Sequence, residues 1–282
     1  MSTSSYPQVT FPDGEPVPAL GQGTWYMGED ASARQQEVRA LQEGIDLGMT
    51  LIDTAEMYAS GGAERVTGEA IAGRRDDVFL VSKVLPYNAG YDDCLHACES
   101  SLARLGTDRL DLYLLHWRGG VPLEETLEAF ERLLHEDKIG AWGVSNFDAD
   151  DMTELLGLPG GDAVATDQVL YNLTRRWPEA HLLPGCRELG IPLMAYSPIE
   201  QGRMLRHPAL LEVAGRHGAT PAQVALAWLL EHDDVIVIPK AASLDHVREN
   251  RQALALDLTT DDLTTLDAGF PAPRGRPAME ML

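Results

Sequence analysis

Short apolar runs alternate with segments of helical periodicity along almost the whole chain. Each run is rich in β-branched or other apolar residues, is bounded by turn residues, and precedes a segment in which apolar positions recur every three or four residues. Eight runs are predicted as strands: residues 20–24, 50–54, 78–83, 110–116, 141–145, 163–168, 192–197 and 235–239. Eight strands that alternate with helices predict a (β/α)8 TIM barrel, an α/β fold.

The segments between the strands supply the helices and their stop signals. The clearest helices are predicted at residues 34–47, 63–72, 93–105, 123–136 and 221–231. Four glycines stand at expected carboxyl ends, where glycine readily adopts the left-handed conformation: Gly48, Gly73, Gly106 and Gly140. An open doubly wound sheet is the rival fold, but the sequence around Gly23 does not match its glycine-rich nucleotide motif.

The amino-terminal segment adds a hairpin to this pattern. Residues 9–18 form two short runs around Asp13-Gly14, a pair that favours a tight turn between antiparallel strands. We expect this hairpin to plug the bottom of the barrel. No internal repeat beyond the strand–helix unit and no linker divides the chain. Residues 1–282 are therefore predicted to form one barrel domain.

Charge and composition exclude several classes of partner. The chain has 282 residues with 22 Lys and Arg against 44 Asp and Glu, which gives a net charge of -22. Such a surface repels nucleic-acid phosphates and anionic membranes. The start of the chain lacks a signal-peptide pattern, and no apolar run approaches the ~20 residues of a membrane span. We expect a cytoplasmic monomer without nucleic-acid or membrane partners.

The cysteines do not predict a metal or disulfide site. Cys94, Cys98 and Cys186 are too few for a disulfide framework, and their spacing is not that of a redox or zinc motif. Cys94, His96 and Cys98 could suggest a metal. However, the two cysteines lie one turn apart on a predicted helix, so they are interpreted as small packing residues. No metal is expected.

Polar side chains collect where three neighbouring strands are predicted to end. Asp53 and Tyr58 follow the second strand, Lys83 ends the third and His116 ends the fourth. In such barrels the active site lies at the carboxyl ends of the strands, so these side chains are expected to converge. Only three of the 22 basic residues are lysine. A retained lysine indicates a position that needs a compact ammonium.

This set of residues suits the protonation of a developing alkoxide. A tyrosine with an ordinary pKa of about 10 is a weak acid at neutral pH. We expect the Lys83 ammonium to lower the pKa of Tyr58, and Asp53 to keep Lys83 charged and oriented. His116 is expected to hydrogen-bond the substrate oxygen or to relay the proton. The alternative is a Schiff-base lyase or aldolase with Lys83 as nucleophile, which the adjacent Asp53 disfavours because the attacking amine must be neutral.

The ordered set Asp53, Tyr58, Lys83 and His116 resembles the catalytic tetrad of the aldo-keto reductases. The resemblance covers residues 17–266 and includes the family's Asp-x-x-x-x-Tyr segment. It implies hydride transfer from a nicotinamide to a carbonyl carbon, with Tyr58 as the general acid on the carbonyl oxygen. A nicotinamide-binding regulatory protein without turnover, which occurs among relatives, is a further alternative.

Later segments resemble the cofactor-binding parts of the same family. The resemblance implies that Ser145, Asn146 and Gln168 bind the carboxamide and that Tyr196 stacks on the nicotinamide ring. Lys240 maps onto the lysine that binds the 2'-phosphate of NADPH. The other implied cofactor-binding residues are Gly23, Thr24, Ser197, Pro198, Gly202, Ser243, His246, Glu249 and Asn250. Arg203 follows Gly202 in the segment that clasps the pyrophosphate in relatives.

Two positions depart from the family pattern. His246 replaces an arginine that pairs with the 2'-phosphate, and a bidentate guanidinium contact is lost with it. Arg248 lies two residues away on a predicted helix and points elsewhere. NADPH is the expected cofactor because Lys240 is retained, with NADH use open. Asp167 replaces a common asparagine beside Gln168.

The substrate pocket is expected to be small-molecule sized and open. Trp25 and Trp117 match positions that line the carbonyl pocket in relatives, although both could be packing residues of the rim. The segment after Ala268 has no helical pattern and is short for a substrate-enclosing loop. The sequence resembles bacterial members that reduce small aldehydes such as methylglyoxal. Oxidation of glycerol or a sugar is the reverse possibility.

Overall fold

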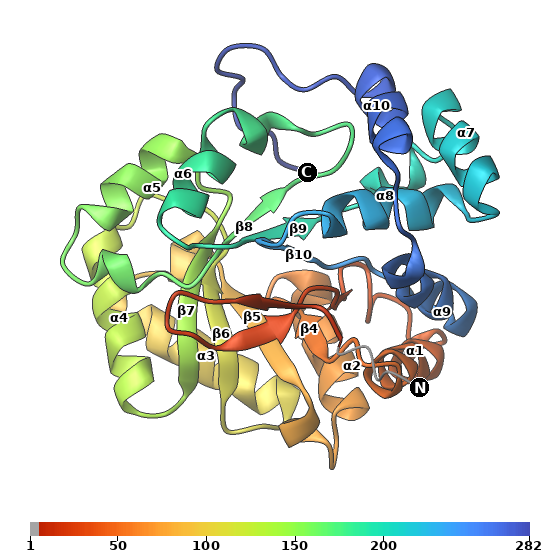
Figure 1. Cartoon of the computed structure of the whole chain (residues 1–282). Coiled ribbons are helices and arrows are strands. Elements are labelled where there is room, and N and C mark those ends of the chain that lie inside the picture. Colours follow the sequence, from red (N-terminus) through yellow and green to blue (C-terminus); the bar gives the residue numbers. More distant parts are fainter. Residues whose placement is uncertain (1–5) are drawn as a thin grey trace.

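Eight parallel strands form a closed sheet that is surrounded by helices (Figure 1). The computed structural model describes residues 6–282. The strands are β3 (Gln22–Gly23), β4 (Leu51–Asp53), β5 (Phe79–Val84), β6 (Leu110–Leu115), β7 (Ile139–Ser145), β8 (Asp167–Leu170), β9 (Leu193–Tyr196) and β10 (Val235–Val237). Parallel bridges from Leu20 to Val237 and from Gly23 to Lys240 join the first strand to the last. The predicted (β/α)8 barrel is confirmed.

The helices pack around the outside of the sheet. They are α1 (Arg34–Asp46), α2 (Gly62–Ala70), α3 (Tyr91–Leu105), α4 (Leu123–His135), α5 (Ala149–Leu156), α6 (Leu182–Glu188), α7 (Pro208–His217), α8 (Pro221–Leu230), α9 (Leu244–Gln252) and α10 (Thr260–Gly269). The five helices predicted from periodicity are present, each with both ends within two residues of its prediction.

Two local predictions are corrected by the structure. Gly48, Gly73 and Gly106 have φ of 92°, 77° and 66°, as expected for helix ends. Gly140 instead lies inside β7, and Asp137 makes the turn after α4 with φ of 55°. The chain turns earlier because Ile139 already pairs with Leu110 of β6. The sixth strand is predicted to start at residue 163 but starts at Asp167, where the chain begins to pair with both β7 and β9.

The amino-terminal hairpin closes one end of the barrel. Strands β1 (Gln8–Thr10) and β2 (Pro16–Pro18) are antiparallel, with Val9 opposite Val17. The turn between them uses Gly14 at φ of 93°. Val9, Phe11 and Val17 are buried in the same cluster as the inward-facing residues Leu51, Val81, Leu112, Leu114, Met194 and Ile236. The hairpin therefore plugs the barrel interior, as the sequence predicts.

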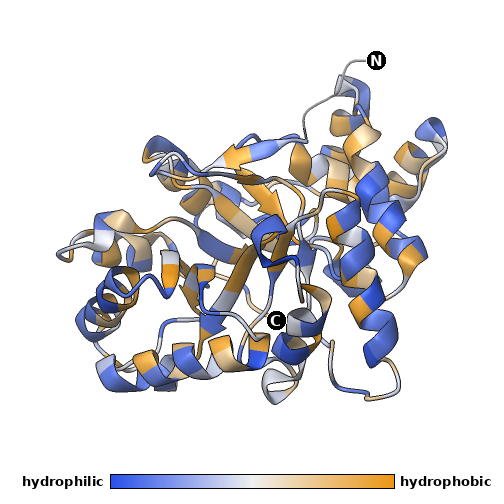
Figure 2. Ribbon diagram, turned by 90° about the horizontal axis from the view of Figure 1, so that it is seen from below, coloured by the Kyte–Doolittle hydropathy of each residue, from blue (hydrophilic) through white to orange (hydrophobic). Residues whose placement is uncertain are grey.

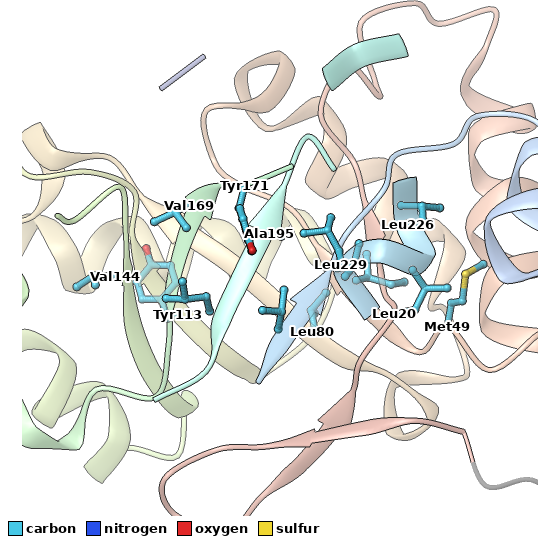
Figure 3. Packing of buried hydrophobic residues seen from close by; sticks show 14 of the residues in the cluster. Leu20, Met49, Leu80, Tyr113, Val144, Val169, Tyr171, Ala195, Leu226 and Leu229 are labelled. Carbon is cyan, nitrogen blue, oxygen red and sulfur yellow. The ribbon is translucent and has the colours of Figure 1, made fainter. Parts of the chain in front are cut away.

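A second, larger apolar layer separates the sheet from the helices. It contains outward-facing strand residues such as Leu80, Tyr113 and Val144, together with helix residues such as Leu226 and Leu229 (Figure 3). Hydrophilic residues collect on the outer surfaces of the helices (Figure 2). Within residues 6–282, no helix has the length and apolar character needed to cross a membrane.

The alternation of side chains along the strands decides which residues reach the interior. Leu80 and Val84 of β5 belong to the outer layer, whereas Val81 belongs to the inner cluster. Because side chains alternate between the two faces, Lys83 points inward like Val81. The same rule turns Asp53 inward with Leu51. The carboxyl ends of these strands therefore deliver charged groups into one space.

Candidate active site

Four polar side chains meet at the carboxyl end of the barrel. Lys83 Nζ lies 2.8 Å from Asp53 Oδ2, 2.9 Å from the carbonyl oxygen of Thr54 and 3.1 Å from the Tyr58 hydroxyl. The His116 and Tyr58 rings pack edge to face with their centroids 5.7 Å apart. Lys83 is fully buried. The structure thus brings together the four residues that the sequence singles out, and surrounds the lysine nitrogen with three acceptors, as an ammonium requires.

Burial has the largest effect on the pKa of Tyr58. Burial, followed by the Asp53 carboxylate, raises the pKa of Tyr58 well above its ordinary value. The net pKa of Tyr58 is therefore raised and not lowered, because desolvation disfavours the charged phenolate, and the stabilising effect of Lys83 on that phenolate stays a prediction. Burial also lowers the pKa of Lys83, while Asp53 opposes that change. Tyr58 is therefore a neutral phenol at neutral pH, with Lys83 placed to stabilise phenolate when the proton leaves.

His116 is neutral as well. Burial, followed by the charge of Lys83, lowers the pKa of His116 to about 2. The Nδ1 atom has no hydrogen-bond partner among the side chains and backbone of residues 6–282. A neutral imidazole donates one hydrogen bond and accepts one. The side chain therefore suits hydrogen bonding to a substrate oxygen better than proton relay as a cation.

A second layer of amides and hydroxyls holds this group in place. Gln168 Nε2 donates to Asp53 Oδ1 at 2.7 Å, and the Gln168 carbonyl oxygen accepts from Ser145 Oγ at 2.8 Å. Asn146 Nδ2 donates to the His116 carbonyl oxygen at 3.0 Å, and Asn146 Oδ1 accepts from the Tyr196 hydroxyl at 2.9 Å. Asn146 has φ of 58°, a strained value for a non-glycine residue. Residues from β7, β8 and β9 are thereby locked around the four central side chains.

Two adjoining cavities open from these side chains. The larger, of about 450 Å3, extends from Asp53 and Tyr58 to Lys240. Its lining also includes nine residues that the sequence predicts to bind the cofactor: Gly23, Thr24, Tyr196, Ser197, Pro198, Gly202, His246, Glu249 and Asn250. The smaller, of about 230 Å3, is lined by His116, Trp117, Ser145, Asn146 and Gln168 among others. Trp25, Tyr58 and Tyr196 line both cavities.

Three candidate cofactor-binding residues lie outside this lining. Ser243 caps α9, where its hydroxyl accepts a hydrogen bond from the His246 backbone nitrogen at 3.3 Å. Arg203 pairs with Glu200 at 3.0 Å instead of facing the cavity. Arg248 pairs with Glu43 of α1 at 2.7 Å. His246 therefore lines the cavity at the position where relatives have an arginine, and neither Arg203 nor Arg248 supplies a cation there.

The carboxyl-terminal segment changes the expected shape of the smaller cavity. Met281 and Leu282 line it, together with Trp25 and Met57. After α10 the chain crosses back toward β8 (Figure 1). Arg276 pairs with Asp150 at 2.5 Å, which fixes part of this segment. This short segment thus contributes a wall that its length alone does not predict, and the expectation of a fairly open pocket stays a prediction.

Several lining residues carry no signal in the sequence. In the larger cavity these are the apolar and amide side chains of Ile199, Gln201, Leu205, Ala222 and Ile238. In the smaller cavity they are Met57, Met281 and Leu282. Ile238 lies near the end of the last predicted strand and Met57 follows the second, so strand-end position could have found them. The others depend on how loops and the carboxyl-terminal segment fold back.

The side chains that line the larger cavity suit a nicotinamide dinucleotide. One end holds the neutral phenol of Tyr58 and the aromatic face of Tyr196, whose hydroxyl donates to the amide of Asn146 in the wall of the smaller cavity. The other end holds the exposed ammonium of Lys240. Amide groups, a flat aromatic face and a cation are suited to a carboxamide, a ring and a phosphate respectively.

Comparisons with known proteins agree with this geometry. A sequence model described as the aldo/keto reductase family matches residues 19–269. The methylglyoxal reductase YeaE of Escherichia coli is 53% identical over 279 residues, which cover 97% of this chain and 98% of that protein. Glyoxal reductase of Bacillus subtilis is 34% identical, with 95% and 94% covered. A Klebsiella pneumoniae aldo/keto reductase solved with NADP and acetate has a TM-score of 0.95 and 51% identity, and covers 98% of this chain and 99% of its own.

Proposed function

Because the chain belongs to the aldo/keto reductase family, we propose that it reduces small aldehydes such as methylglyoxal to alcohols with NADPH. The observation that carries the proposal is the contact of the buried Lys83 ammonium with both Asp53 and the Tyr58 hydroxyl, at 2.8 and 3.1 Å. That contact adjoins the point where the two cavities meet. A substrate oxygen in the smaller cavity would lie beside the phenol.

The residues divide the proton chemistry among them. When bound, NADPH supplies a hydride for the carbonyl carbon. Tyr58 donates its proton to the oxygen that gains negative charge, and Lys83 stabilises the resulting phenolate. Asp53 holds Lys83, and Gln168 holds Asp53. Neutral His116 orients the carbonyl oxygen by hydrogen bonding, and Tyr58 regains a proton from solvent after product leaves.

The cofactor assignment follows the cavity and the relatives. Tyr196 and Lys240 line the larger cavity and are assigned to the nicotinamide ring and the 2'-phosphate. Ser145, Asn146 and Gln168 line the adjoining smaller cavity and are assigned to the carboxamide by their resemblance to the family. Solved relatives from Klebsiella pneumoniae, at 51% identity, hold NADP or NADPH. Trp25 and Trp117, which line the smaller cavity, are assigned to the substrate. We also propose that the enzyme acts as a cytoplasmic monomer.

The test is loss of NADPH absorbance on addition of methylglyoxal, with NADH assayed in parallel. The proposal expects turnover with NADPH and a lower kcat/KM with NADH. Tight NADPH binding without turnover of any small aldehyde would favour the regulatory alternative.

The Schiff-base alternative has a separate test. All three hydrogens of the Lys83 ammonium have acceptors within 3.1 Å, which leaves no lone pair for attack on a carbonyl. We expect borohydride to trap no substrate on Lys83. A mass increase on the peptide that contains Lys83 would support the lyase alternative instead.

A further inference from the structure

The segment after β9 has a strained backbone beside the larger cavity. Ser197, Glu200 and Gln201 have φ of 47°, 50° and 54°. Non-glycine residues adopt this left-handed region rarely, and the surrounding structure must hold them there. Ser197 and Gln201 line the cavity. We call residues 197–202 the cofactor segment.

The buried carboxylate of Glu200 anchors this segment. It is 4% exposed and accepts hydrogen bonds from Asn172 Nδ2 at 2.9 Å and from Arg175 Nε and Nη2 at 3.3 and 3.2 Å. Arg203 adds a contact of 3.0 Å. Asn172 also donates to the Ser197 carbonyl oxygen at 2.9 Å. Although burial opposes it, the hydrogen bonds from Asn172 and Arg175 hold the pKa of Glu200 below its ordinary value.

Arg175 has a second acidic partner outside the cofactor segment. Its Nη1 atom contacts the carboxylate of Glu280. The next two residues, Met281 and Leu282, line the smaller cavity with Tyr58 and His116. One guanidinium thus joins a wall of the cofactor cavity to a wall of the aldehyde pocket.

We propose that Arg175 is a positioning residue that couples the cofactor segment to residues 271–282. A guanidinium presents five N–H donors in one rigid plane, so it can hold two carboxylates at fixed positions. A dinucleotide bound in the larger cavity restrains the cofactor segment and with it Glu200 and Arg175. The restrained Arg175 orders Glu280, and Met281 and Leu282 then complete the aldehyde pocket. This coupling rests on the proposed use of the larger cavity by NADPH.

The test separates this contact from general loosening of the carboxyl-terminal segment. Glu280→Gln removes one acidic partner of Arg175 and leaves the contacts with Glu200. Asp150→Asn is the matched control, because Asp150 pairs with Arg276 of the same segment without touching Glu200. Hydrogen exchange of residues 197–202 and 271–282 is measured with and without NADPH. NADPH affinity is measured by fluorescence titration, and KM and kcat are measured with methylglyoxal.

In the unmodified enzyme and in Asp150→Asn, NADPH is expected to slow exchange in both segments by about threefold or more. In Glu280→Gln, NADPH should slow exchange only in residues 197–202. The KM for methylglyoxal should rise about fivefold, with kcat and NADPH affinity within about twofold of the unmodified enzyme. Arg175→Lys should weaken NADPH binding and raise KM together, because it loosens both contacts.

Equal protection of residues 271–282 by NADPH in Glu280→Gln and the unmodified enzyme would overturn the coupling. So would the same loss in Asp150→Asn, which would show that any weakened anchor frees the segment. An unchanged KM in Arg175→Lys would also overturn it. Failure of NADPH to bind the unmodified enzyme would instead reject the proposed use of the larger cavity, and the titration reports that separately.

Discussion

At the scale of single residues, Asp53 and Lys83 form an ion pair in the barrel interior. Removing two charges from water costs several kcal/mol for each ion, and only close pairing with further hydrogen bonds offsets it. Here Gln168 and the Thr54 carbonyl oxygen supply those bonds. The pair is therefore a weak source of stability, and it serves to hold a cation beside the phenol of Tyr58.

Asp167 gives a prediction about stability and pH. Both of its carboxyl oxygens are buried, and burial raises its pKa well above the ordinary value. The folded protein therefore binds a proton that the unfolded chain releases above an unfolded-state pKa of about 3.9. The associated stability is present below that pH and is lost as the pH rises toward the folded pKa, by about 1.4 kcal/mol per pH unit.

We expect Asp167→Asn, which has no ionisable group there, to gain stability over the unmodified protein as the pH increases. Thermal unfolding at several values between pH 4 and pH 8 measures the difference. A difference in Tm that stays constant over this range would contradict an ionisable buried Asp167.

His246 gives a prediction about cofactor choice. It is exposed at the start of α9 and lines the cavity with Lys240. His246→Arg adds a permanent cation that can form two hydrogen bonds to a phosphate, so the ratio of kcat/KM for NADPH to that for NADH should rise about tenfold. Arg248→Gln is the control, since Arg248 pairs with Glu43 away from the cavity. An unchanged ratio in His246→Arg would remove the proposed role of this position.

At the scale of elements, the start of α8 is connected to the cofactor cavity. The Thr220 hydroxyl accepts from the Gln223 backbone nitrogen at 3.2 Å and donates to the Glu249 carboxylate of α9. Glu249 lines the larger cavity. One cap therefore fixes both a helix end and a residue of the site.

We expect Thr220→Ala to lower the free energy of unfolding by about 1–2 kcal/mol and to weaken NADPH binding. Urea unfolding and a binding titration measure the two effects. Thr220→Ser, which keeps the hydroxyl, should restore both. Thr259→Ala removes the equivalent cap of α10 away from the cavity, so it should lower stability alone. Equal NADPH affinity in Thr220→Ala and Thr220→Ser would contradict the connection.

The elements differ in how well the sequence predicts them. Helices with a broad buried face, such as α3 and α4, are predicted by the periodicity of their apolar residues. Helix α9 buries only Val247 and Asn250, so its apolar signal is weak. Its start is marked instead by the Ser243 cap. Strand ends were predictable because parallel strands bring their carboxyl ends to one face.

The parts of the site that the sequence did not predict share one cause. Met281 and Gln201 reach the cavities through contacts between distant segments, such as the ion pairs of Arg175 with Glu200 and Glu280. Such pairs join residues with no regular spacing along the chain, so no local pattern announces them. The net direction of the Tyr58 pKa was missed for a related reason, because it depends on how completely the folded chain excludes water.

At the scale of the whole molecule, the net charge favours a monomer. The net charge of -22 makes copies repel one another at low ionic strength. We expect light scattering after size exclusion to give a mass of about 30.8 kDa. A stable dimer that loses activity on dilution would contradict this expectation.

The most direct test of the whole account is the activity of Tyr58→Phe. This change removes the proton donor and keeps the ring that packs against His116. Aldehyde reduction should fall by about a thousandfold or more, while the NADPH dissociation constant stays within about threefold of the unmodified enzyme. Reduction of methylglyoxal by Tyr58→Phe at a rate near that of the unmodified enzyme would contradict the assignment of Tyr58 as the acid.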